Sequence, residues 1–226
     1  MNRYEDGVLA KKEENPISEE YFLYKNPQFY KLVGEIIHKE ESSVIYKNEQ
    51  ITTSLEFKDV SLDEYPQLKS FFETKQNLFP EDYFILTNFT LKTESHTYSI
   101  QEERLKPIVL FKKKPRENWV EGEAFNDFNV VTLNAPPKSV GHILVWLHEL
   151  GHIEDHDQLL EDSFQIAILK IKLNDQNIST ENIYEHQTKI DELIFKRERK
   201  GWAEALHRIR PFTKDLGIST EALNEF

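Results

Sequence analysis

The chain has 226 residues, of which 28 are Lys or Arg and 40 are Asp or Glu, so its formal net charge is −12 at pH 7. A chain this acidic is repelled by nucleic acids and by anionic membranes, and we expect neither as a partner. The hydrophobic content of 38% and the aromatic content of 12% provide enough material for a packed core. There is no cysteine, which excludes disulfides, thiolate nucleophiles and cysteine-ligated metal sites.

Two further features bear on where the protein resides. The start of the chain, MNRYEDGVLAKKEEN, lacks the apolar segment of a signal peptide. The longest uninterrupted aliphatic and aromatic run, Ile143–Leu147, is far shorter than the roughly 20 residues that cross a membrane. We therefore expect a soluble, cytoplasmic protein, since the lack of disulfides suits a reducing compartment.

The first 60 residues are expected to form a helix and a hairpin. The segment Ser18–Glu41 predicts a helix that is broken or kinked near Pro27. Two β-rich runs within Ser43–Phe57 flank the polar sequence Lys47–Gln50 and predict a β-hairpin. We expect residues 1–60 to pack on a catalytic part, residues 61–226, either as a separate unit or within one continuous domain.

The second part begins with a predicted helix, Leu62–Gln76, which has Pro66 near its first turn. Three strand candidates follow, joined by short polar connections as in an antiparallel meander. They are Tyr83–Leu91, His96–Ile100 and Leu105–Lys112. A fourth candidate, Phe128–Leu133, is stopped by the sequence Asn134-Ala135-Pro136-Pro137.

The remainder of the chain is predicted to be helical. One helix covers Ser139–Asp155, and a second covers Glu161–Leu173. Apolar residues recur along the second helix with helical spacing, at Phe164, Ala167, Ile168 and Ile171. A third helix is capped by Ser179 or Thr180 and runs to about Arg210, where Pro211 ends it. Strands followed by helices predict an α+β fold, with an antiparallel or mixed sheet preceding a helical part.

The first of these helices contains the sequence HELGH. Side chains at positions i and i+4 of a helix share a face, so His148 and His152 can reach one metal ion. Glu149 is placed beside that pair and can accept a proton from a metal-bound water. Two histidine ligands and an adjacent base are the HExxH arrangement of zinc metallopeptidases.

The alternative is that the two histidines are only a structural pair. The apolar residues that precede them, Ile143–Leu147, predict a deeply buried helix. Two histidines and a glutamate on such a helix are costly to bury unless something binds them. Gly151 lowers helix propensity by about 1 kcal/mol relative to Ala, which is tolerable if another backbone or a substrate must come close. These features favour a Zn²⁺ site.

A catalytic zinc ion normally has three protein ligands, so a third must come from elsewhere. On the last helix, Glu198 lies in the middle of an apolar stripe, whereas Glu192 and Glu204 fall on the polar side. A carboxylate in such a stripe needs a cation, either the metal or a buried arginine. Asp155 is a rival, as a ligand or as a hydrogen-bond partner of a ligand histidine, and His156 is a weaker one.

These motifs carry a family resemblance. HELGH, followed by a later helix that contains Glu198, Gly201, Trp202, Ala205 and Leu206, resembles the gluzincin group of zincin metallopeptidases. The nearest resemblance is to small bacterial and phage zincins, including the ImmA/IrrE type. It covers residues 142–210 and implies a zincin-like fold with His148 and His152 as ligands, Glu149 as base and Glu198 as third ligand.

The sequence also departs from the patterns of these families. The segment between His152 and Glu198 is longer than usual for the ImmA/IrrE type, and an additional helix occupies it. The metzincin pattern requires Gly at the position of Asp155 and His at that of Gln158, and the third ligand of peptide deformylase is a cysteine. Zincins hold their substrate by edge pairing to a strand upstream of the metal helix. Phe128–Asn134 is in the right place for this, and it is equally consistent with an ordinary core strand.

The sequence thus leaves two functions open. The first is a zinc-dependent metallopeptidase that hydrolyses a peptide or protein substrate with Glu149 as general base. The second is a non-catalytic zincin-fold protein that acts as a binding or regulatory partner in a phage or stress-response pair. The intact Glu149 favours the first, because a structural zinc site needs no base. Three residues have side chains suited to polarising the scissile carbonyl, but their spacing selects none of them: Tyr184, His186 and His207.

Overall fold

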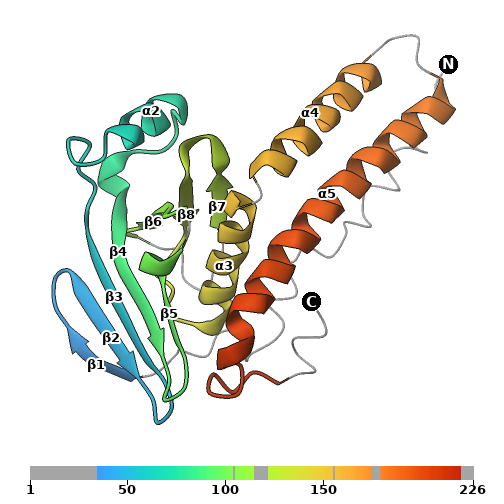
Figure 1. Ribbon diagram of the computed structural model, residues 1–226. Coiled ribbons are helices and arrows are strands. Elements are labelled where there is room, and N and C mark those ends of the chain that lie inside the picture. The colour runs from blue at the N-terminus through green and yellow to red at the C-terminus, as the bar shows by residue number, and fades with distance from the viewer. Residues whose placement is uncertain (1–34, 104, 115–121, 155, 175–178, 220–226) are drawn as a thin grey trace, which may run out of the picture.

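The computed structural model describes residues 35–103, 105–114, 122–154, 156–174 and 179–219. These residues form an eight-stranded mixed sheet with helices on both of its faces (Figure 1). The strands follow the order β1-β2-β3-β4-β6-β8-β7, and β5 pairs with one end of β4. Every pairing is antiparallel except that of β6 with β8. The α+β class expected from the sequence is therefore confirmed.

The first three strands form a meander at one side of the sheet. They are β1 (Glu35–Lys39), β2 (Ser43–Lys47) and β3 (Thr52–Asp59). The pairing of β2 with β3 confirms the predicted hairpin. The prediction of a helix over Ser18–Glu41 is wrong at its end, because Glu35–Lys39 pairs with β2 as a strand. The earlier part of that predicted helix lies outside the described residues.

The other strands are β4 (Tyr83–Lys92), β5 (Thr97–Ser99), β6 (Ile108–Lys112), β7 (Gly122–Phe125) and β8 (Val130–Leu133). The expected meander of three strands is wrong in its order, because β6 pairs with β4 rather than with β5. The strand β3 pairs with one edge of β4, and both β5 and β6 pair with the other edge. The strand β7 was not predicted, and it ends the sheet beside β8.

Successive side chains of the central strands enter two separate cores, as the twofold period of a strand requires. On β6, Leu110 packs with helix α2 (Pro66–Thr74), whereas Val109 and Phe111 pack on the opposite face. That opposite face carries the larger core, which includes α3 (Val140–Glu154) and the second half of α5 (Thr180–Ile209). Its largest fully buried side chain is Trp146 of α3.

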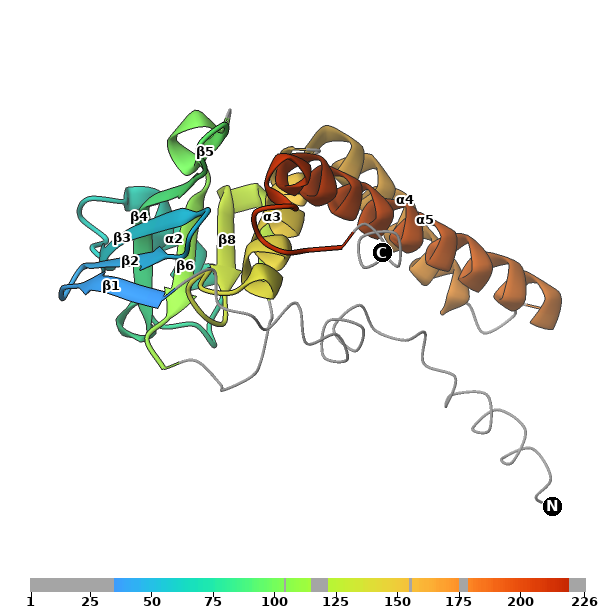
Figure 2. The ribbon, with the colours of Figure 1, turned by 90° about the horizontal axis from the view of Figure 1, so that it is seen from below.

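Helix α4 (His156–Leu173) returns alongside the first half of α5, and the two helices project from the body as an arm (Figures 1 and 2). Ser179 caps α5 as predicted, because its hydroxyl accepts a hydrogen bond from the backbone N–H of Asn182. The expected start of α4 near Glu161 is too late by several residues. None of the described helices is both long and apolar enough to cross a lipid bilayer.

Candidate metal centre

Helix α3 lies between the sheet and α5 and carries three polar residues in an apolar setting. Its first turn is capped by Ser139, whose hydroxyl accepts a hydrogen bond from the backbone N–H of His142 at 3.3 Å. Every residue of α3 except His142 and Glu154 is buried. The side chains of His148, Glu149 and His152 are therefore held on a rigid element with little access to water.

The two helices α3 and α5 cross at a pair of glycines. A Cβ atom at Gly151 would lie 3.0 Å from the carbonyl oxygen of Gly201. A Cβ atom at Gly201 would lie 2.9 Å from ring atoms of both His148 and His152. The contact at Gly201 is closer than real Cβ atoms show, and the contact at Gly151 is tighter than nine in ten real Cβ contacts. The absence of both side chains lets the α5 backbone approach the histidine rings, which agrees with the close approach expected at Gly151 from the sequence.

This crossing brings Glu198 to the two histidines. Its Oε2 atom lies 3.1 Å from Nε2 of His148 and 3.5 Å from Nε2 of His152, and the two Nε2 atoms are 3.0 Å apart. Atoms bound about 2.05 Å from a tetrahedral zinc ion are separated from one another by about 3.3 Å. The three donor atoms therefore form a triangle of the size that a zinc site requires, and together they could hold a metal ion.

The charge of the cluster also suits a cation. Burial alone raises the pKa of Glu198, but the hydrogen bonds between its carboxylate and the two histidines, together with their charges, lower it well below the ordinary value. The carboxylate is therefore ionised at neutral pH. Among the described residues its partners are histidines and not an arginine, so the salt-bridge alternative for Glu198 finds no support.

Glu149 differs in its environment from Glu198. Burial raises its pKa above the ordinary value, the two histidines lower it, and Glu198 raises it. A hydrogen bond from the backbone N–H of Ala124, on β7, fixes the carboxylate against the sheet. Gly122 permits this contact, because a Cβ atom there would lie 2.8 Å from Cγ of Glu149. The site thus contains one ionised carboxylate and one whose proton affinity is raised.

Neighbouring side chains hold the site in shape. The indole of Trp202 is buried and lies against His148 with ring centroids 4.3 Å apart. At the end of α3, Arg208 of α5 contacts Glu154 at 2.5 Å, Glu103 at 3.3 Å and Glu204 at 3.4 Å. This largely buried guanidinium fastens the end of α3 to α5, one turn beyond the glycine crossing.

The other candidates from the sequence are placed elsewhere or are not described. Asp155 lies outside the described residues, and His156 begins α4 with a side chain that is also outside them. Tyr184 and His186 precede Glu198 by at least twelve residues on one helix, which at 1.5 Å per residue is about 18 Å. His207 follows it by nine residues, or about 13 Å. None of these three lies beside Glu198.

The edge strand next to the site is β7 and not β8. The interpretation of Phe128–Asn134 as a strand with a free edge is wrong, because β8 pairs with β6 on one side and with β7 on the other. In the described part of the chain, β7 pairs only with β8. The sequence Gly-Glu-Ala-Phe of β7 has too few β-branched or aromatic residues to be recognised as a strand.

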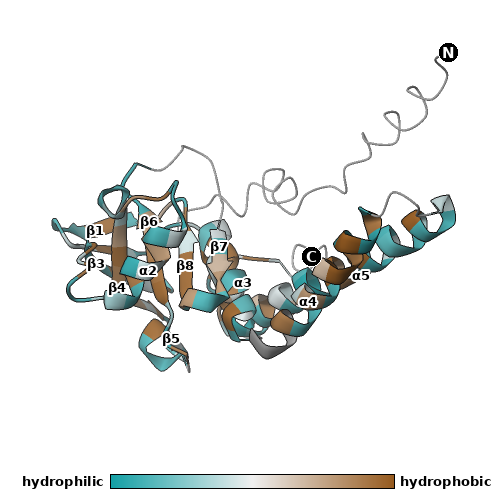
Figure 3. Cartoon of the chain, turned by 90° about the horizontal axis from the view of Figure 1, so that it is seen from above, coloured by the Kyte–Doolittle hydropathy of each residue, from teal (hydrophilic) through white to brown (hydrophobic). Residues whose placement is uncertain are grey.

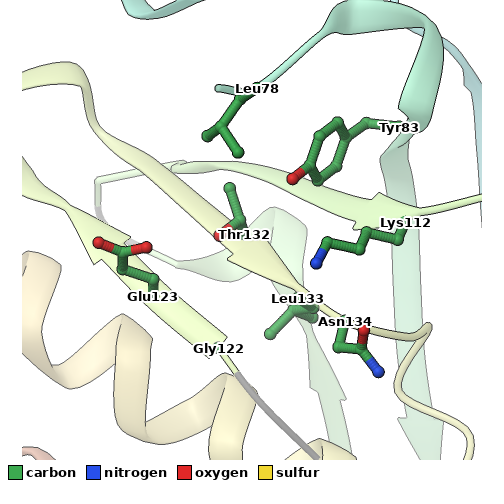
Figure 4. Close-up of a pocket in the computed structure, with 8 residues that line it drawn as sticks. All are labelled: Leu78, Tyr83, Lys112, Gly122, Glu123, Thr132, Leu133 and Asn134. Carbon is green, nitrogen blue, oxygen red and sulfur yellow. The ribbon is translucent and has the colours of Figure 1, made fainter. Parts of the chain in front are cut away.

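A pocket lies at this end of the sheet (Figure 4). Leu78 and residues from four strands line it: Tyr83, Lys112, Gly122, Glu123, Thr132, Leu133 and Asn134. Neither histidine nor Glu198 lines it. Glu123 alternates along β7 with Gly122 and Ala124, which approach Glu149, so its side chain projects from the opposite face of the strand. The pocket therefore contains none of the three donor residues, and it adjoins the site at Gly122, which lines the pocket and approaches Glu149.

No protein-family model, curated protein or solved structure matches this chain. The assignment of a function consequently depends on the geometry of the site.

Proposed function

We propose that this protein is a zinc-dependent peptidase of the zincin type. The observation that carries the proposal is the convergence of His148, His152 and Glu198 from two helices, with donor atoms 3.0–3.5 Å apart. Two imidazoles and one carboxylate are the ligand set of many catalytic zinc sites. Glu149 directly follows the first of these histidines in the chain. We assign to these four residues the roles that the gluzincin resemblance implies.

His148, His152 and Glu198 would hold the zinc ion, which would act as a Lewis acid and activate a water molecule for attack at neutral pH. The chain supplies the base. The carboxylate of Glu149 accepts a proton from the water and transfers it to the leaving amine. Its raised pKa suits the first of these steps, because a carboxylate with a higher proton affinity is a stronger base. Burial of the site excludes bulk water from the reacting atoms.

The strand β7 is the proposed binding surface for the substrate backbone. Its outer edge is unpaired among the described strands, and Ala124 links it directly to Glu149. An extended peptide that pairs with this edge would lie beside the base, and main-chain hydrogen bonds would hold it with little dependence on sequence. Side chains of such a peptide would alternate between the α3 face and the face that carries the pocket of Figure 4.

The Glu198→Ala variant should lose its metal. Changes to residues that only support a ligand reduce metal affinity by about 10–100-fold, so removal of a ligand should reduce zinc affinity by more than about 100-fold. The measurement is zinc stoichiometry by elemental analysis after dialysis, followed by titration with a zinc-buffered chelator. Glu192→Ala is the control, because Glu192 is an exposed carboxylate on the same helix. Equal zinc binding by both variants would exclude Glu198 as the third ligand.

The peptidase activity itself is tested with a mixture of peptides from a digested proteome. The zinc-loaded protein should generate new peptide termini, which mass spectrometry identifies, and a chelator should abolish them until zinc is restored. A protein that binds zinc stoichiometrically but leaves the whole mixture intact would contradict the peptidase proposal. That result would favour the non-catalytic alternative.

A further inference from the structure

Helix α4 carries an exposed apolar stripe on the side that faces away from α5. Four residues form it: Leu160, Phe164, Ala167 and Ile171. Leu160 is 50% exposed, Phe164 68% and Ile171 72%, and Ala167 is also exposed. Ile168, which is 37% exposed, flanks the stripe. Three of these residues, Phe164, Ala167 and Ile171, are among those whose helical spacing predicted the helix, and the structure leaves them on the surface.

The opposite face of α4, which packs on α5, is partly polar. Asp162 is only 2% exposed there and forms an ion pair with Lys196 of α5 at 3.6 Å. Arg197 of α5 donates to the hydroxyl of Ser163 at 3.5 Å. Further along α4, Ile166 and Leu169 pack with Ile190 of α5. The helix therefore exposes a continuous apolar stripe, and an exposed apolar patch is a feature of protein interaction sites.

The arm formed by α4 and α5 leaves this stripe accessible. Figures 1 and 2 show the arm projecting beyond the sheet, and in Figure 1 α4 lies along the upper left side of α5, which is the side nearer the sheet. Figure 3 shows hydrophobic residues along both helices of the arm, interspersed with hydrophilic ones. No described residue covers the stripe. Because the four stripe residues are exposed, another helix can approach them.

We propose that the stripe binds the same stripe of a second copy of this chain, in antiparallel orientation. The intervals between Leu160, Phe164, Ala167 and Ile171 are four, three and four residues, so the pattern reads the same in both directions. An antiparallel pair places Leu160 of one copy against Ile171 of the other. At the centre, Phe164 meets Ala167, and a large side chain faces a small one. Such self-complementarity is what a twofold interface requires.

The charges beside the stripe fit the same arrangement. In an antiparallel helix pair, a given flank of one helix adjoins the same flank of the other. Glu161 and Lys172 lie on one flank of the stripe, at opposite ends, and both are exposed. In the proposed dimer, Glu161 of each copy lies two residues, or about 3 Å along the axis, from the level of Lys172 of the other, so two opposite-charge contacts form by symmetry. A stripe of about three helical turns makes a small interface, for which we expect micromolar association.

Sedimentation velocity over a range of protein concentrations tests this proposal. The wild-type protein should be a dimer at high concentration and should dissociate on dilution. Phe164→Ser should raise the dissociation constant by at least about tenfold, because each copy loses an apolar side chain from the centre. Phe195→Ser is the matched control, since Phe195 of α5 is also 68% exposed but lies outside the stripe, and it should leave the constant unchanged.

Charge exchange distinguishes the antiparallel pair from other associations. Glu161→Lys and Lys172→Glu should each weaken the dimer roughly tenfold, because each single change converts two attractive contacts into repulsive ones. The double variant, with both changes, should recover the wild-type constant. The proposal is overturned if the wild-type protein is monomeric at every concentration. It is equally overturned if Phe195→Ser dissociates the dimer as Phe164→Ser does, or if the double charge exchange fails to restore it.

Discussion

The Glu149→Gln variant should hydrolyse peptides about 10²–10⁴-fold more slowly than the wild-type protein while it retains a full complement of zinc. The amide has nearly the shape of the carboxylate and can still accept the hydrogen bond from the backbone of Ala124. It cannot accept a proton from water at neutral pH. The expected loss therefore falls on kcat, and zinc content and thermal stability should remain close to those of the wild-type protein.

The control for this experiment is Glu192→Gln, which makes the same chemical change at an exposed position of α5. It should leave both zinc content and hydrolysis unchanged. Initial rates with a peptide identified from the digested mixture provide the measurement. A Glu149→Gln protein that retains the wild-type rate would exclude Glu149 as the base. One that loses its zinc would show that Glu149 contributes to metal binding instead.

The Gly201→Ala variant should disrupt the metal centre although the substitution is favourable for an isolated helix. Replacing Gly by Ala inside a helix stabilises it by about 1 kcal/mol when nothing else changes. Here the added methyl group would lie 2.9 Å from the rings of both His148 and His152. The helices must separate or the rings must rotate, and either movement displaces Glu198 from the histidines. We expect zinc affinity to fall by about tenfold or more and the melting temperature to decrease.

Helix propensity alone predicts that Gly201→Ala raises stability, so a decrease in stability would indicate the close contact with the histidines. Ala203→Gly, at an exposed position of the same helix, provides the comparison, since it measures the intrinsic glycine penalty on α5 without touching the histidines. It should lower stability by about 1 kcal/mol and leave zinc affinity unaltered. A Gly201→Ala protein that is more stable than the wild type and binds zinc as tightly would show that the close helix crossing is not required for the site.

The local part of the candidate site could be predicted from the sequence. His148, Glu149 and His152 belong to one helix, so their relative positions follow from helical geometry alone. Glu198 is far along the chain, yet it could be identified because a carboxylate within an apolar stripe requires a partner. The close approach at Gly151 was recognisable for a similar reason. What the sequence did not reveal was that Gly201 is the residue on the other side of this contact.

The failed predictions share a physical cause, which is that distant contacts override local preference. Glu35–Lys39 continues a helical pattern in the sequence, but it is a strand because β2 lies beside it. The order of β4, β5 and β6 depends on which edge of β4 each strand reaches, and short connections do not determine that. On α4, the apolar residues that predicted the helix lie on its exposed face. The face that packs on α5 instead includes the ion pair of Asp162 with Lys196.

The most direct test of the metal centre is a crystal structure of the protein grown with zinc, with diffraction data recorded on both sides of the zinc absorption edge. We predict one strong anomalous peak within about 2.2 Å of Nε2 of His148, Nε2 of His152 and a carboxylate oxygen of Glu198. A map with no peak between these three residues, or with zinc bound elsewhere and Glu198 directed into solvent, would contradict the proposed zinc site and the peptidase function that depends on it.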